Sequence, residues 1–267
     1  SVVVREHECG IDPETDQDIR ETRTDFYLGR SSERPTLDCA RAMTTRQWQE
    51  GCRSFQGMPK SRKGLSVNRD GTETREYSTT SWTYRAKFIM EARLSGDRFR
   101  NGSCWQCIQE SETASFRESA DDTPRTNASF TLATDAYGRP LLSASVWYGR
   151  GGSKPDDVPD VVWSEQKKNH VTFTETRYTQ DCGHTSGRFR MGLQESTVSY
   201  EKTGHAASDL ENAQSLNALF ADVTRPRKVL ARENVVFYDD TLSVPRTDGT
   251  CGLAGTVYER YGLAFEA

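Results

Sequence analysis

Residues 82–94 read WTYRAKFIMEARL and decide the fold class of this chain. Every even position from Trp82 to Leu94 is apolar, and the odd positions are polar or charged except for Ile89. In an extended backbone, successive side chains point to opposite faces, so a pattern that repeats every two residues makes one face apolar. The stretch therefore predicts a long, half-buried β-strand. A helix would scatter the same apolar residues around its circumference. We expect this strand to organise the first half of the chain.

Shorter segments of the same kind lie on both sides of it. The residues before position 25 are rich in acids and predict an extended arm pinned by Cys9, or a mobile one. A strand returning from Cys104 would place Glu110 and Glu112 on the face of Ile108. The pattern continues over residues 128–132, 142–148, 161–163, 171–173, 189–193, 198–200, 235–238 and 257–265. The fold is therefore predicted to be mainly β, with antiparallel, β-sandwich-like domains.

One short helix is predicted in each half. Thr44 with Gln47, and Ser208 with Glu211, have the spacing of a helix-capping box. Residues 117–125 are polar, end in a proline signal and form the expected linker. The prediction is an N-terminal cysteine-rich β domain with a short helix over residues 1–120. A C-terminal β-sandwich-like domain would follow over residues 125–267.

Composition excludes two classes of partner. The chain has 267 residues, 34% hydrophobic and 28% charged, with a formal net charge of −4. That charge is too small to steer a nucleic acid or a membrane surface. No run approaches the ~18 consecutive apolar residues of a membrane span. We expect neither nucleic acid nor a membrane span.

The cysteines indicate a compartment. All seven lie in polar surroundings, which favours a secreted, extracellular, disulfide-bonded chain over a cytosolic one. The disulfide candidates are Cys9, Cys39, Cys52, Cys104, Cys107, Cys182 and Cys251. Asn101 and Asn127 each begin a glycosylation sequon, which predicts a glycoprotein. The chain has no initiator Met, as in a processed or recombinant form.

Metal and cofactor signals are weak. Cys104 and Cys107 have the spacing of a redox dithiol or half a zinc site. On a strand these thiols point to opposite faces, which favours two separate disulfides. The four histidines have no metal-ligand spacing, and no nucleophile elbow, P-loop or G-x-G-x-x-G occurs. We therefore predict no metal and no cofactor.

A dispersed pattern resembles the mono-ADP-ribosyltransferase toxins. Arg30 follows a short strand, Ser78 lies in Tyr-Ser-Thr-Thr, and Glu110 and Glu112 form Glu-x-Glu, in the family's order. The resemblance implies that Arg30 binds the phosphates of NAD and Ser78 supports the nicotinamide pocket. Glu112 would stabilise an oxocarbenium-like state. The likeness covers only residues 26–112, and it departs from the family at Thr80.

The organisation as a whole resembles secreted fungal effector proteins built from two cystine-stapled β domains. That resemblance implies a role in binding host proteins. It also implies that Cys182 and Cys251 staple the second half. The odd number of cysteines in the first half does not allow all of them to pair within that half. It implies a free thiol or a disulfide between the two halves.

The leading hypothesis is a secreted, non-enzymatic, β-rich interaction protein, similar to an effector or virulence factor, that binds a host or extracellular protein. Trp147, Tyr148 and the loop over residues 149–159 are the candidate contacts, since aromatic side chains and loops recur at interfaces. The alternative is an ADP-ribosyltransferase-like toxin that uses NAD. A carbohydrate-binding module is a further alternative.

Overall fold

The computed structural model describes residues 2–8, 19–33, 35–39, 42–67, 73–92, 102–117, 123–154, 156, 158–182, 190–239, 241–247, 249–252, 255 and 257–264. The chain divides into two units. The first comprises Ser1–Arg139 and Val146–Asn169, and the second comprises Pro140–Ser145 and His170–Ala267. Both are mainly antiparallel β with few helices, which confirms the predicted fold class. The domain boundary at residues 120–125 stays a prediction.

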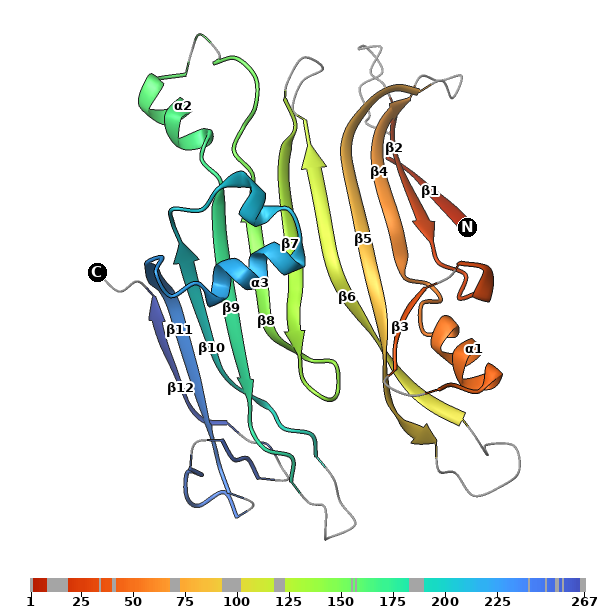
Figure 1. Cartoon of the computed structure of the whole chain (residues 1–267), viewed down its shortest axis with the longest axis vertical. Helices are drawn as coiled ribbons and strands as arrows, with labels where there is room; N and C mark the ends of the chain where they lie inside the picture. Colours follow the sequence, from red (N-terminus) through yellow and green to blue (C-terminus); the bar gives the residue numbers. More distant parts are fainter. Residues whose placement is uncertain are drawn as a thin grey trace. The chain divides into compact units, whose positions relative to one another are not determined.

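The strands of the first unit pair in the order β1-β2-β4-β5-β6-β7 (Figure 1). All these pairs are antiparallel, and only β3 runs parallel to its partner, β5, among the described strands. The elements are β1 Val2–Glu8, β2 Ile19–Phe26, η1 Ser31–Glu33, β3 Thr36–Asp38, α1 Thr45–Arg53, β4 Pro59–Val67, β5 Glu73–Ala92, β6 Gly102–Phe116, β7 Arg125–Thr134 and α2 Asp160–Gln166.

The second unit follows the strand order β8-β9-β10-β11-β12. Strand β8 is shared, because its residues 140–145 belong to this unit and Val146 and Trp147 to the first. The elements are β8 Pro140–Trp147, β9 His170–Tyr178, β10 Gln194–Lys202, η3 Ala207–Leu210, α3 Ala213–Ala221, β11 Arg227–Phe237 and β12 Val257–Ala264. Within the part of the chain that the structure describes, no helix is long and apolar enough to span a membrane.

The predicted central strand is β5, which extends over 20 residues. Tyr84 and Ala86 are buried on the face that the alternation predicts. Ile89, the apolar exception in the pattern, is the extra residue of a β-bulge, since the pairing register shifts between Phe88 and Met90. Met90 is consequently 53% exposed rather than buried. The alternation therefore fails beyond the bulge.

Helix α1 covers one face of the first unit, against β3, β5 and β6 (Figure 1). The hydroxyl of Thr44 accepts from the N–H of Gln47 at 3.2 Å, and the Gln47 side chain accepts from the N–H of Thr44 at 3.0 Å. The predicted capping box is confirmed. Just after the helix, Phe55 is 1% exposed and packs with Tyr84 and Ala86. Burying a side chain of this size contributes about 2 kcal/mol.

Helix α3 lies against β9 in the second unit. The Phe173 and Phe220 rings are 5.2 Å apart, and Leu216 and Leu219 are buried. Lys202, on β10, is 1% exposed. Its ammonium donates to the carbonyls of Leu219, Phe220 and Asp222. Carbonyls at the C-terminus of a helix have no hydrogen-bond partner within the helix, and Lys202 supplies one here. Burial lowers the pKa of Lys202.

Three predicted segments fold differently. The amino-terminal arm is a hairpin, because Val2–Glu8 pairs with Ile19–Phe26 through main-chain hydrogen bonds that need few apolar side chains. Residues 161–163, predicted as a strand, lie in helix α2. Three apolar residues in a row do not separate strand from helix, and here only Trp163 is buried. Residues 191–193 are not a strand, and residue 189 lies outside the described part.

The second helix starts later than Ser208 predicts. Residues 207–210 form a 3-10 turn, in which the Asp209 carboxylate accepts from the N–H of Ala206 at 2.8 Å. Helix α3 then begins at Ala213, and its cap is Asn212, whose side chain accepts from the N–H of Ser215 at 2.9 Å. Asn caps a helix as well as Ser does. The 3-10 turn over residues 207–210 therefore shifts the start of the helix to Asn212.

Candidate functional site

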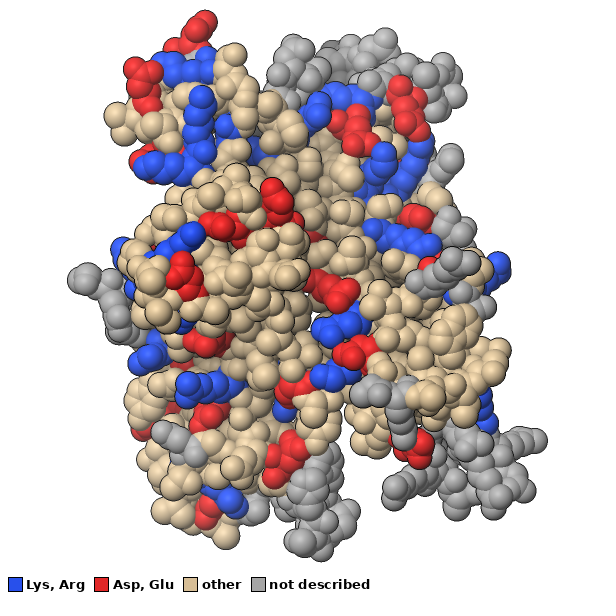
Figure 2. Space-filling view, in the orientation of Figure 1, with Lys and Arg blue, Asp and Glu red and all other residues tan. Residues whose placement is uncertain are grey.

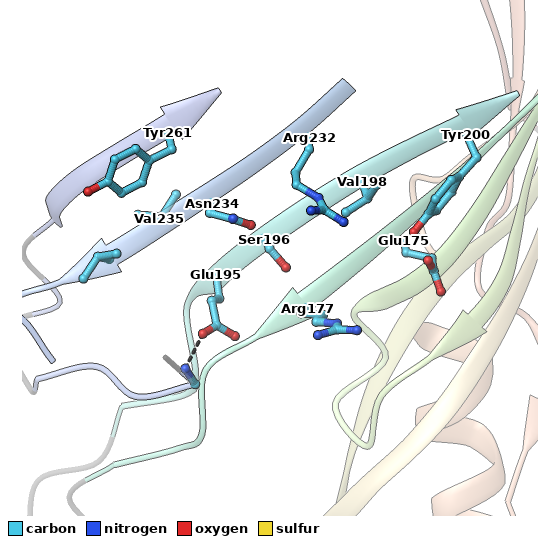
Figure 3. A pocket seen from close by; sticks show the side chains of 12 residues that line it. Glu175, Arg177, Glu195, Ser196, Val198, Tyr200, Arg232, Asn234, Val235 and Tyr261 are labelled. Carbon is cyan, nitrogen blue, oxygen red and sulfur yellow. Dashed lines mark hydrogen bonds between the residues drawn. The ribbon is translucent and has the colours of Figure 1, made fainter. Parts of the chain in front are cut away.

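A polar groove of about 690 Å³ opens on one face of β9, β10, β11 and β12, and we call it the β9–β12 groove (Figure 3). It carries both signs of charge, amide and hydroxyl groups, and two tyrosines. The lining residues are Glu175, Arg177, Glu195, Ser196, Val198, Tyr200, Arg232, Asn234, Val235, Val236, Gly249 and Tyr261.

Strand register brings these side chains together. Ser196 of β10 pairs with Arg177 of β9 on one side and with Asn234 of β11 on the other. Asn234 pairs in turn with Tyr261 of β12. Residues directly opposite each other in an antiparallel pair share a face, so one row of polar groups crosses four strands.

A β-bulge adds a carboxylate to the groove. The register of β10 against β9 shifts between Gln194 and Ser196, which leaves Glu195 as the extra residue. Bulges redirect a side chain out of the alternation, and Glu195 thereby lines the groove next to Ser196. Its carboxylate accepts from the N–H of Gly249, and this bond fixes one wall of the groove.

The ionisable side chains of the groove differ in whether they have a hydrogen-bond or ion-pair partner. Burial first, and then a hydrogen bond to the Glu175 carboxylate, raises the pKa of Tyr200. Arg177 and Arg232 both reach into the groove (Figure 3). Among the residues that the structure describes, neither guanidinium has an ion-pair or hydrogen-bond partner. Two available guanidinium groups on one face favour a carboxylate or another planar anion.

Sequence reasoning missed this groove. Its residues come from four strands and span positions 175 to 261, so no local motif joins them. Single strands carry only a partial signal, which is a pair of polar residues two positions apart, as in Glu175-Thr-Arg177 and Arg232-Glu-Asn234. Such spacing places two polar groups on the same face of a strand.

The residues of the transferase-like pattern lie apart. Arg30 is in the exposed turn after β2, where its N–H donates to Glu33. Ser78 and Glu112 lie opposite Phe116 and Trp82 in the β5–β6 pair. The two pairs are four positions apart along the strands, which corresponds to a distance of about 13 Å. Among the described residues no hydrogen bond or ion pair joins Arg30, Ser78 and Glu112, and whether they form a site stays a prediction.

The two glutamates of that pattern are separated by a bulge. Glu110 is the extra residue on β6, because Gln109 and Ser111 oppose neighbouring residues of β5. It pairs with Arg85 at 3.1 Å, whereas Glu112 accepts from the Gln109 side chain at 3.2 Å. The prediction that Glu112 shares the face of Ile108 is wrong, since the bulge reverses the alternation.

The predicted contact residues lie at the end of β8. Trp147 is 60% exposed, and Tyr148 is half-buried with its N–H donating to the carbonyl of Thr126 at 3.0 Å. In the loop that follows, the N–H of Gly149 donates to the Asn169 side chain at 2.7 Å. Binding of a partner at this surface stays a prediction.

Six of the seven cysteines are described, and none is at disulfide distance from another. Cys104 is exposed and Cys107 packs against the core of the first unit, so they face opposite ways as predicted. Only Cys182 and Cys251, among the described cysteines, have sulfurs in contact, at 3.8 Å. Cys9 lies outside the described residues.

The remaining predicted sites are placed as follows. Asn101 lies outside the described residues, and Asn127 is half-buried in β7, opposite Ala114. In the described ranges no group of three or more His, Cys, Asp or Glu is arranged to hold a metal ion. Glycosylation at either asparagine stays a prediction.

Comparison with known proteins gives a fold. No protein-family model matches the sequence, and no curated protein matches it. The structure is similar to that of TcdB2-TccC3, with a TM-score of 0.67, 15% identity and 97% of this chain covered. It is also similar to TcdB2-TccC3-TEV, with a TM-score of 0.70, 15% identity and 96% covered. A third match is the Photorhabdus luminescens Tc holotoxin pore carrying the mutation TccC3-D651A, with a TM-score of 0.69, 16% identity and 97% covered.

The match is to a small part of much larger chains. This chain spans 14% of the length of each of those three chains. At 15–16% identity the likeness establishes the fold alone.

Proposed function

We propose that this chain is a toxin-related, non-enzymatic β segment that acts by binding protein within a larger assembly. The observation that carries the proposal is the fold match over nearly the whole chain, at TM-scores of 0.67–0.70. A chain that resembles one seventh of a much larger toxin component is better suited to build and contact an assembly than to act alone. The effector-like role and the extracellular location belong to the same proposal.

The structural neighbours support a protein as the partner. They are TcdB2-TccC3, TcdB2-TccC3-Cdc42 and a Tc holotoxin pore. By analogy, the partner of this chain is a protein.

The β9–β12 groove is the contact surface that we assign to this partner. Arg177 and Arg232 project from strands on either side of β10, and their two guanidinium groups can each take a carboxylate in bidentate geometry. Ser196 lies on β10, between the strands of the two arginines, and Asn234 lies two residues after Arg232 on β11; both supply hydrogen-bonding groups. The partner segment would therefore present Asp or Glu side chains to the groove.

The charge of the rest of the surface supports a local contact. Basic and acidic side chains are interspersed over the face drawn in Figure 2, with a formal net charge of −4 for the chain. Interspersed charge gives little long-range steering, so specificity would arise at short range from groups such as the two arginines.

The test compares the proteins that co-purify under native conditions with the wild type, with R177A/R232A and with K228A. Lys228 is exposed, lies on the same strand as Arg232 and does not line the groove, so it is the matched control. We expect the amount of partner that co-purifies with the double variant to fall by about tenfold or more. Each lost charge-assisted contact is worth roughly 1.5–3 kcal/mol of binding free energy. Unchanged thermal melting would verify folding. Equal retention by R177A/R232A and wild type would contradict the role of the groove.

A further inference from the structure

Two thiols of the second unit lie next to each other. Cys182 follows β9 and forms an isolated bridge with Arg190, with N–H···O distances of 3.0 Å in both directions. Cys251 lies 69 positions further along the chain and is 1% exposed. Their sulfur atoms are 3.8 Å apart.

A main-chain hydrogen bond holds the two segments together independently of the sulfurs. The N–H of Gln180 donates to the carbonyl of Gly249 at 2.7 Å, and the N–H of Gly249 donates to Glu195. The Cys251 thiol lies 3.9 Å from the carbonyl of Gln180. A disulfide has sulfurs about 2.05 Å apart, so the bond needs an approach of under roughly 2 Å between groups already in place.

The other described cysteines offer no such pair. Cys39, Cys52, Cys104 and Cys107 have no sulfur neighbour within contact distance among the described residues. Burial raises the pKa of Cys107 to about 11 and raises that of Cys52. Both therefore exchange slowly, since the thiolate is the reactive species. Among the described cysteines, Cys182 and Cys251 are thus the pair whose geometry allows a disulfide within the folded chain.

We propose that Cys182 and Cys251 form a disulfide that locks the wall of the β9–β12 groove. In exchange with oxidised glutathione, the two protein thiols lose two protons and two electrons and become one S–S bond. The glutathione disulfide gains them and leaves as two thiols, through a mixed-disulfide intermediate. The new bond would tie the end of β9 to the segment that contains Gly249, whose N–H holds Glu195 in the groove. This proposal does not depend on the identity of any partner.

The experiment oxidises the folded chain with oxidised glutathione, blocks remaining thiols by alkylation and maps tryptic peptides by mass spectrometry. The expected product links peptide 178–188 to peptide 247–260, and dithiothreitol reverses it. It should form faster in the folded chain than in urea, because only the native fold brings together thiols 69 positions apart. Recovery of both peptides alkylated would overturn the proposal, as would equal rates in the folded and unfolded chain.

Variants supply a second readout. Oxidation should raise the melting temperature of the wild type by several degrees, because the bond closes a long loop in the unfolded chain. C182S and C251S should lose this reducible shift, and C104S, at an exposed position, should keep it. A shift that persists in C182S would contradict the assignment. The peptide map of the wild type decides the question even where a serine variant folds poorly.

Discussion

At the scale of single residues, Glu33 shows how one carboxylate fixes a turn. It accepts from the N–H groups of Leu28 and Arg30, each at 3.0 Å, and from the Lys60 ammonium at 2.9 Å. Burial raises the pKa of Glu33, but Lys60 and the backbone donors of Arg30 and Leu28 outweigh it. Together they hold the pKa at about 2, below its ordinary value of 4.5. The same Lys60 ammonium lies 4.5 Å from the centroid of the Tyr27 ring.

The first prediction concerns acid stability. A carboxyl group whose pKa is lower in the folded chain stabilises the fold above its unfolded pKa, and the stability is lost as the pH falls through the folded pKa. For Glu33 the loss should run from about pH 5 to about pH 2 and amount to at most about 3 kcal/mol. E33Q should be less stable at pH 7 and should melt with a weaker pH dependence over this range. E211Q, at an exposed position, is the control, and identical pH profiles for E33Q and E211Q would contradict the assignment.

At the scale of elements, the C-terminus of α3 depends on a residue from the sheet. Lys202 satisfies three main-chain carbonyls there from a buried position on β10. A cation at this end also interacts favourably with the helix dipole.

We therefore expect K202M to lower the free energy of unfolding by roughly 2–4 kcal/mol, because it leaves buried carbonyls without donors. Urea denaturation measures the change, and K228M on the neighbouring strand is the control. A loss below about 0.5 kcal/mol for K202M would mean that water replaces the ammonium. That result would contradict a structural role for Lys202.

The elements also show which features a sequence predicts. Thr44 and Gln47 are a local capping box, and the helix begins there as predicted. The bulges at Ile89, Glu110 and Glu195 are not local, because each depends on how two strands pair. A single bulge reverses every later side chain, which is why Met90 is exposed. The β9–β12 groove depends on one of these bulges and on the register of four strands, so alternation in any one strand does not predict it.

At the scale of the whole molecule, we expect no NAD chemistry. Ser78 and Glu112 are separated by about 13 Å of strand, and Glu112 is engaged by Gln109. Incubation with NAD should release no more nicotinamide than buffer does, and E112Q should alter the melting temperature more than any turnover. NAD turnover that is abolished in a correctly folded E112Q variant would favour the transferase instead.

The central claim is that this chain works as part of a larger protein assembly. Native mass spectrometry of the protein isolated from its source tests it most directly, with a denaturing gel to separate a longer polypeptide from bound partners. We expect the particle that contains this sequence to have a mass several times the 30.1 kDa of the chain. A stable, partner-free particle of 30.1 kDa at micromolar concentration would contradict it.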